Sequence, residues 1–202
     1  MAVSKKFSAA AIRQAYLAGL RHFGENYVQE FADKQPQLAD LPEARFHFIG
    51  HLQANKSRQA AMLFQVIHTV DSARLLQRLD TAAREAGKVL DILLEVKLSG
   101  EETKSGVGES GIPAILAAAD SCQSLRVTGL MTMPPWSQDA EKSRPYFQRL
   151  AALARLYKLP QLSMGMSNDF EVAIEEGATL VRVGTALFGP RPKASPATLT
   201  LL

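Results

Sequence analysis

The sequence lacks the features that mark secreted and membrane-spanning proteins. Cys122 is the only cysteine among 202 residues, so a disulfide framework within the chain is excluded. No apolar run is long enough to span a bilayer, and no basic segment precedes an apolar stretch at the amino terminus. With 47% hydrophobic residues, the chain can bury a large core without disulfides or metal. We therefore expect a cytoplasmic protein with no membrane partner.

Clustered basic charge and metal-binding patterns are missing as well. The net charge is +3, but the basic residues are scattered among acids and form no dense run with stacking aromatics. We expect no nucleic-acid partner, and the mild positive excess suits an anionic ligand. The four histidines have no cysteine partners and no helical H-x-x-x-H spacing, so we expect no metal site.

The chain does contain a repeated alternation of short apolar strands and amphipathic helices. Strands are expected at residues 2–5, 22–25, 45–50, 65–70, 91–98, 126–131, 162–166 and 180–184. Helical patterns lie between them, for example at 8–18, 72–86 and 139–156. Eight such units predict one α/β domain, a (β/α)8 TIM-type barrel over residues 1–190, with 191–202 as a loosely held tail. A doubly wound open sheet is the main alternative.

Two strand ends, far apart in the sequence, indicate a specific chemistry. Lys5 ends the first expected strand, and a lysine amine condenses with a carbonyl to form a Schiff base. At the end of the eighth strand, the backbone N–H groups of Gly184 and Thr185, with the Thr185 hydroxyl, are suited to holding a phosphate. Phosphate sites in these barrels are commonly made by the loops after strands seven and eight. The pair indicates an aldehyde cofactor that carries a phosphate.

Three more polar residues are candidates at the same face of the barrel. Asn26 follows the second strand and Ser167 the seventh, although Asn26, Glu25 or Ser167 could instead cap the helix that follows. Arg182 lies inside an apolar strand. An unpartnered guanidinium there is costly, so we expect Arg182 to find an acceptor inside the barrel.

Seven segments together resemble a known family, the YggS/PROSC-type pyridoxal phosphate homeostasis proteins, which are related to the N-terminal barrel of alanine racemase. They are AVSK at 2–5, FGENYVQE at 23–30, HFIGHLQANK at 47–56, KSG at 104–106, GLM at 129–131, SMGMS at 163–167 and VRVGTALFG at 181–189. The resemblance covers nearly the whole chain. It implies a barrel that holds pyridoxal 5'-phosphate on Lys5, with Arg182 donating a hydrogen bond to the pyridine nitrogen, and a task in vitamin B6 balance.

The chain departs from the family pattern in two places. Family members usually have a helix before the first strand, whereas Met1 stands where that strand is already under way. We therefore expect a barrel that lacks this helix. Lys6 follows Lys5 where the family tends to have a small residue, and this makes Lys6 a second candidate amine. In a strand the two lysines would point to opposite sides, and the motif favours Lys5.

The leading hypothesis is a carrier of pyridoxal phosphate, monomeric and not an enzyme, that supplies PLP-dependent apoenzymes. A guanidinium accepts no hydrogen bond, so Arg182 would keep the pyridine nitrogen unprotonated and the ring a poor electron sink. The alternative is a racemase-like PLP enzyme. Related racemases take a second base from a further domain, and here the sequence stops at Leu202, just after the eighth strand. A phosphosugar-binding barrel enzyme would use the same phosphate loops.

Overall fold

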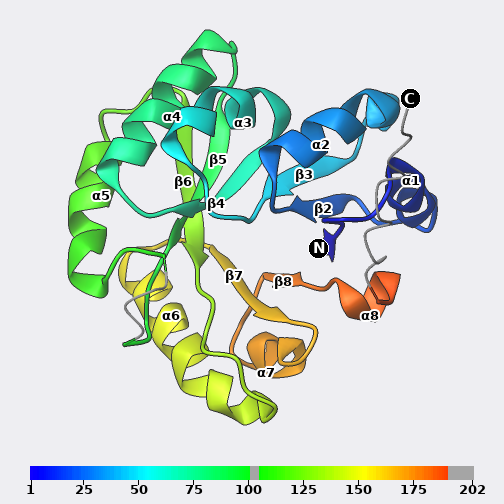
Figure 1. The fold of residues 1–202 in the computed structure, drawn as a ribbon. Coiled ribbons are helices and arrows are strands. Elements are labelled where there is room, and N and C mark those ends of the chain that lie inside the picture. Colours follow the sequence, from blue (N-terminus) through cyan, green and yellow to red (C-terminus); the bar gives the residue numbers. More distant parts are fainter. Residues whose placement is uncertain (101–104, 191–202) are drawn as a thin grey trace, which may run out of the picture.

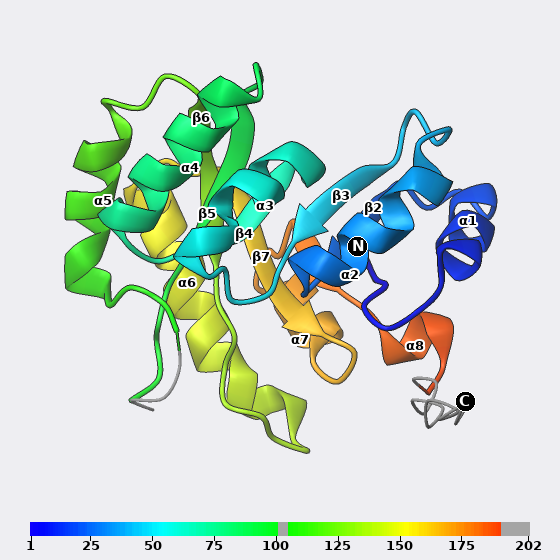
Figure 2. The same ribbon diagram turned by 45° about the horizontal axis from the view of Figure 1, so that its top comes forward.

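A computed structural model describes residues 1–100 and 105–190, and in these residues eight parallel strands form one sheet in sequential order. Figures 1 and 2 show the strands forming a ring with helices around its outside. The ring is completed by a bridge between Ala2 and Val183, where the Val3 N–H donates to the Val183 carbonyl at 2.8 Å. The expected (β/α)8 barrel is thereby confirmed, because in an open doubly wound sheet the first and last strands would not meet.

The strands and helices follow the predicted alternation. The strands are β1 (Ala2–Val3), β2 (His22–Glu25), β3 (Arg45–Phe48), β4 (Val66–Val70), β5 (Leu90–Glu95), β6 (Leu125–Met131), β7 (Gln161–Met166) and β8 (Leu180–Arg182). The helices are α1 (Ala9–Leu17), α2 (Val28–Lys34), α3 (Ser57–Leu63), α4 (Ala73–Glu85), α5 (Ile112–Ala119), α6 (Arg144–Leu156), α7 (Phe170–Glu175) and α8 (Thr185–Phe188). None of the helices in the described part of the chain is both long enough and apolar enough to span a bilayer.

Capping residues fix several helix starts. Ser8 accepts a hydrogen bond from the Ala11 N–H at the start of α1, and Ser72 from the Leu75 N–H at the start of α4. The helix expected from residue 139 begins only at Arg144, after a short 3-10 turn. Pro145 explains this start, because its fixed φ and missing N–H suit the first turn of a helix.

The first strand is shorter than expected, and this corrects the prediction about the two lysines. β1 ends at Val3, and Lys5 and Lys6 lie in the turn that follows. Lys6 has a φ of 66°, so the alternation of a strand does not apply to the pair. The segment 191–202, predicted to be a loosely held tail, and Lys104 of the KSG motif lie outside the described residues.

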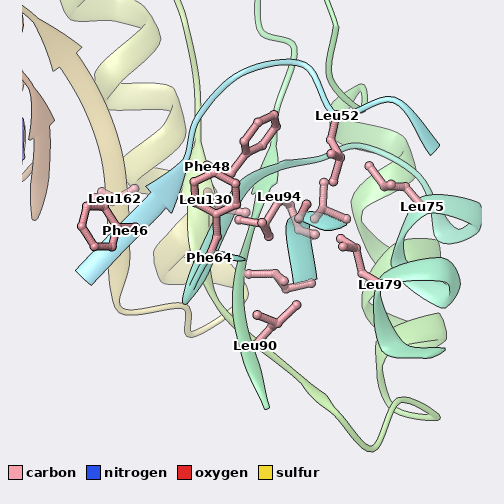
Figure 3. Packing of buried hydrophobic residues seen from close by; sticks show 14 of the residues in the cluster. Phe46, Phe48, Leu52, Phe64, Leu75, Leu79, Leu90, Leu94, Leu130 and Leu162 are labelled. Carbon is pink, nitrogen blue, oxygen red and sulfur yellow. The ribbon is translucent and has the colours of Figure 1, made fainter. Parts of the chain in front are cut away.

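The hydrophobic core lies between the sheet and the helices (Figure 3). Aromatic rings pack at its centre: the centroids of Phe31 and Phe46 are 4.6 Å apart, and those of Phe31 and Phe64 are 4.8 Å apart. From the helical side, α4 contributes Leu75 and Leu79. β4 and β5 are buried along their whole length, as expected of parallel strands covered on both faces. This rigid ring positions the strand ends that carry the polar side chains.

Candidate functional site

A cavity of about 320 Å³ opens at the carboxyl ends of the strands. Its walls come from the ends of β1, β2, β3 and β8 and from the loops after β6 and β7. All six residues proposed from the sequence line it: Lys5, Asn26, Ser167, Arg182, Gly184 and Thr185. They converge because the carboxyl ends of parallel barrel strands open on one face. We call this space the main cavity.

The loop after β6 also contributes to the main cavity, although none of its residues is among the six proposed cofactor-binding residues. Residues 133–137, with the sequence MPPWS, line the wall, and Trp136 is largely exposed. Asn168 donates from its side chain to the Ser137 carbonyl at 2.9 Å, which ties this loop to the loop after β7. The two prolines of the segment were visible in the sequence, and the loop after a barrel strand is where site residues are expected.

The turn after β1 distinguishes the two lysines. Lys5 is half-buried and lines the main cavity, whereas Lys6 is exposed and does not. The Lys6 N–H donates to Glu30 Oε1 at 2.5 Å, which ties the turn to helix α2. The turn is therefore held from outside the cavity, and Lys5 is the lysine of the pair that faces the ligand space.

A buried ionic network beneath this turn was not predicted. Lys34 is 8% exposed, and its Nζ donates to Glu25 Oε1 at 3.1 Å, to Glu30 Oε1 at 2.6 Å and to the Ser4 carbonyl at 3.2 Å. The Ser4 hydroxyl donates to the same Glu25 oxygen at 2.8 Å. Burial raises the pKa of Glu25, and the adjacent Lys34 opposes that shift. The only sequence signal was the i, i+4 spacing of Glu30 and Lys34.

The capping alternatives for Glu25, Asn26 and Ser167 are not supported. Helix α2 has Tyr27 as its N-cap, and helix α7 has Asp169. Asn26 Oδ1 is buried without a hydrogen-bond partner among the described residues. Ser167 Oγ instead accepts from the Gly184 N–H at a long 3.4 Å, which joins the loops after β7 and β8. Ser167, Gly184 and Thr185 thus form one end of the main cavity.

Arg182 has the inward acceptors that its position requires. It is 4% exposed and donates to Ser163 Oγ at 2.8 Å and to the Thr132 carbonyl at 2.9 Å. Burial lowers the pKa of Arg182 to about 10, so the guanidinium stays charged at neutral pH. These two bonds hold the positive group at the wall of the main cavity, which Arg182 lines.

Three histidines continue from Ser163 across the barrel interior. His68 Nδ1 lies 2.9 Å from Ser163 Oγ, His47 Nδ1 lies 2.9 Å from His68 Nε2, and His22 Nδ1 lies 2.8 Å from His47 Nε2. Burial lowers the pKa of His47 to about 3 and that of His68 well below its ordinary value, so both rings are neutral. In the described residues no group of three or more His, Cys, Asp or Glu side chains could hold a metal.

The histidine chain has one hydrogen-bonding direction that satisfies its members. A neutral imidazole donates from one nitrogen and accepts at the other. Because Arg182 already donates to Ser163, the serine hydroxyl can donate to His68, and each ring can then donate to the next, towards His22. This arrangement was not predicted. Its signal was a histidine inside each of three consecutive expected strands.

A second cavity of about 280 Å³ adjoins the first, and the two share Asn26, Ile49 and Met133 as lining residues. We call it the side cavity. Glu95, the last residue of β5, lines it and is 3% exposed. Burial and then the charge of Asp71 raise the pKa of Glu95 to about 7. No site residue was predicted at the end of the fifth strand, although an acid inside the apolar run of residues 92–96 was a visible signal.

Comparison with known proteins first defines the class. The family model described as alanine racemase, N-terminal domain, matches residues 1–192. A solved alanine racemase from Clostridium difficile superimposes with a TM-score of 0.74 over 96% of this chain and 52% of that chain, at 10% sequence identity. At that identity the likeness concerns the fold alone, which is the barrel of the racemase N-terminal domain.

Closer relatives identify the family within this class. Proteins named pyridoxal phosphate homeostasis protein from Pseudomonas aeruginosa and Aquifex aeolicus are 46% and 44% identical, over 98% and 95% of this chain and 86% of each relative. PipY of Synechococcus elongatus, solved with PLP bound, superimposes with a TM-score of 0.86 at 43% identity, over 94% of this chain and 91% of that one. The chain belongs to the family of pyridoxal phosphate homeostasis proteins.

Proposed function

We propose that this protein binds pyridoxal 5'-phosphate in the main cavity and acts in the balance of that cofactor, without an amino-acid reaction of its own. The observation that carries the proposal is the convergence of Lys5 and Arg182 with Ser167, Gly184 and Thr185 on one cavity. The names of the relatives and the PLP-bound PipY structure support it.

The residues of the main cavity fit this cofactor from end to end. Ser167 and Thr185 offer hydroxyl groups beside the Gly184 N–H, and this combination suits a phosphate dianion. Asn26 Oδ1 is buried without a partner, so a donor on a ligand would satisfy it. When bound, the cofactor supplies an aldehyde that condenses reversibly with a lysine amine. Lys5 is the proposed amine.

Arg182 disfavours an enzyme that needs the cofactor ring as a strong electron sink, although it is compatible with a racemase. Its guanidinium is fixed by Ser163 and Thr132 and has only N–H donors to present to a ligand. A ring nitrogen that meets it must accept the hydrogen bond and is therefore unprotonated. An unprotonated pyridine withdraws electrons weakly, and carbanion chemistry is then poorly supported.

Reduction with borohydride tests the assignment of the lysine. We expect reduction of the purified protein to fix the cofactor covalently on Lys5, as located by peptide mass mapping. Lys6→Ala is the matched control and should leave the adduct in place, whereas Lys5→Ala should remove it. An adduct on Lys6 or Lys104 in the wild-type protein would contradict the assignment.

We further propose that the carrier is monomeric and that its recipients are PLP-dependent apoenzymes. The test mixes the loaded protein with a PLP-dependent apoenzyme and follows recovery of that enzyme's activity, while sedimentation measures the carrier's mass. Recovery no faster than with the same concentration of free cofactor would contradict a role in transfer.

A further inference from the structure

The side cavity is lined by two residues that carry acceptor oxygens, Glu95 and Asn26. The Glu95 carboxyl makes no hydrogen bond or ion pair with another side chain in the ranges 1–100 and 105–190, and it is almost completely buried. Asn26 Oδ1, on a residue that lines both cavities, is buried and also lacks a partner there. Burying a carboxylate without a donor is costly, so a ligand that brings donors would bind favourably.

Three of the other polar residues around the side cavity make hydrogen bonds within the protein. The Thr69 hydroxyl donates to the Gly50 carbonyl at 2.6 Å, and Ser105 Oγ lies 3.2 Å from His51 Nδ1. Glu95 and Asn26 are therefore the residues to which the hydrogen-bond donors and positive charge of a ligand could bind. Gly50 keeps this wall close to Asn26, because a Cβ at Gly50 would overlap the Asn26 carbonyl oxygen.

We propose that the side cavity is a binding site for the primary ammonium group of a small molecule, with the Glu95 carboxylate and Asn26 Oδ1 as its acceptors. An ammonium group has three N–H donors and one positive charge, which match the two acceptors. At about 30 Å³ per molecule of liquid water, the 280 Å³ cavity corresponds to roughly nine waters, the space of a small amine or amino acid.

Four other charged or titratable groups act on Glu95 or line the cavity. Asp71 adds negative potential, which favours a cation, and Arg182 on β8 opposes it from within the barrel. Lys97 and His51 line the same cavity. The cavity thus carries both signs of charge, and a free α-amino acid can bring a carboxylate as well as an ammonium group. An amino acid and a simple amine would both place an ammonium group at the Glu95 carboxylate.

The inference rests on the proposed cofactor site only for its context, since Glu95 lines the side cavity alone, whereas Asn26 is shared by the two cavities. An amine added to the loaded protein could also react with the cofactor. The experiment therefore uses the full chain after borohydride reduction, in which the cofactor can no longer exchange. If no cofactor is found at that step, the proposed function fails, and the amine titration is still carried out on the protein as purified.

The test is calorimetric titration with L-alanine, ethylamine and propionate at pH 8. We expect saturable binding of L-alanine and ethylamine and none of propionate. Glu95→Gln keeps the shape of the side chain but removes its charge, and it should weaken amine binding at least tenfold. Glu85→Gln, which alters an exposed carboxylate paired with Arg58, is the matched control and should leave binding unchanged. Tighter binding of alanine than of ethylamine would identify amino acids as the ligand class, and equal binding would identify simple amines.

A pH series gives a second measurement that needs no variant. Protonation of Glu95 removes the acceptor charge, so ethylamine binding should weaken below pH 7, by about tenfold per pH unit well below the pKa. The inference is overturned if neither amine binds saturably, if propionate binds as well as alanine, or if Glu95→Gln stays within twofold of the wild type.

Discussion

At Lys5, the chain places the proposed cofactor-binding amine on a turn rather than on a strand. The turn is held by Glu30, and beneath it Lys34 joins Glu25 and Ser4. The backbone around Lys5 is thereby fixed by residues that do not line the main cavity. Such a support orients a ligand-binding side chain without occupying the ligand space.

Loss of the Lys34 charge should destabilise the protein. Lys34→Met would leave the Glu25 carboxylate buried without its cation, a change that typically costs about 3 to 5 kcal/mol. The measurement is urea unfolding at pH 7. The double variant Glu25→Gln, Lys34→Met is the control and should recover part of the loss, because no unpaired charge remains. A double variant less stable than Lys34→Met alone would contradict this account.

The hydroxyl end of the main cavity should carry much of the cofactor affinity. Replacing Ser167 with Ala and Thr185 with Val removes two hydrogen-bonding groups that face a dianion. Each bond to a charged group is worth about 1.5 to 3 kcal/mol, so affinity should fall at least about tenfold. Cofactor titration followed by absorbance measures it. The control variant Thr81→Val, Ser121→Ala alters two exposed hydroxyls and should leave the cofactor affinity unchanged. Wild-type affinity in the Ser167→Ala, Thr185→Val variant would refute the assignment.

At the scale of elements, the sequence predicted well the features that depend on neighbouring residues, such as the position of each strand. Each expected strand was an apolar run. β2 has its predicted bounds because its apolar run ends where its pairing with the neighbouring strand ends. The ends of β1, β3, β5 and β8 were wrong by two or three residues. A strand ends where its neighbour stops pairing with it, and that depends on register across the sheet. The histidine chain was not predicted for the same reason, since it joins side chains from four strands.

The histidine chain should make the protein less stable in acid. His47 is neutral in the fold with a pKa of about 3, whereas the unfolded value is 6.5. Between these values the unfolded state binds more protons, so stability falls as pH decreases from 6.5 towards 3, by about 1.4 kcal/mol per pH unit for this histidine. Glu95 acts in the opposite sense, because its raised pKa favours the folded state at low pH.

Substitution of His47 separates these contributions. His47→Gln removes one titrating group, so the dependence of unfolding free energy on pH should become shallower by about that amount between pH 6 and 4. Urea unfolding at several pH values measures the slope. Substitution of the exposed His51 should leave the slope near that of the wild type. An unchanged slope in His47→Gln would mean that the ring is not buried in its neutral form.

At the scale of the whole molecule, the barrel explains why six residues could be assigned to one site from the sequence. Parallel strands in a ring place all their carboxyl ends on one face, so sequence order and strand ends sufficed to group Lys5 with Arg182 and Thr185. The side cavity was not predicted, because a cavity depends on how side chains of β3, β4 and β5 fill the mouth. Glu95 and Asn26 meet there only through packing.

The whole molecule should hold its cofactor without processing amino acids. Arg182 offers a ring nitrogen only donors, and this disfavours build-up of negative charge on the cofactor ring. We expect negligible exchange of the α-proton for deuterium across a panel of L- and D-amino acids, with transfer of cofactor to an apoenzyme in the same preparation. Proton NMR in deuterated buffer measures the exchange, and Lys5→Ala provides the background rate. Rapid exchange that disappears in Lys5→Ala, without transfer to the apoenzyme, would instead establish a racemase-like enzyme, because the lysine would then be moving protons at the substrate carbon.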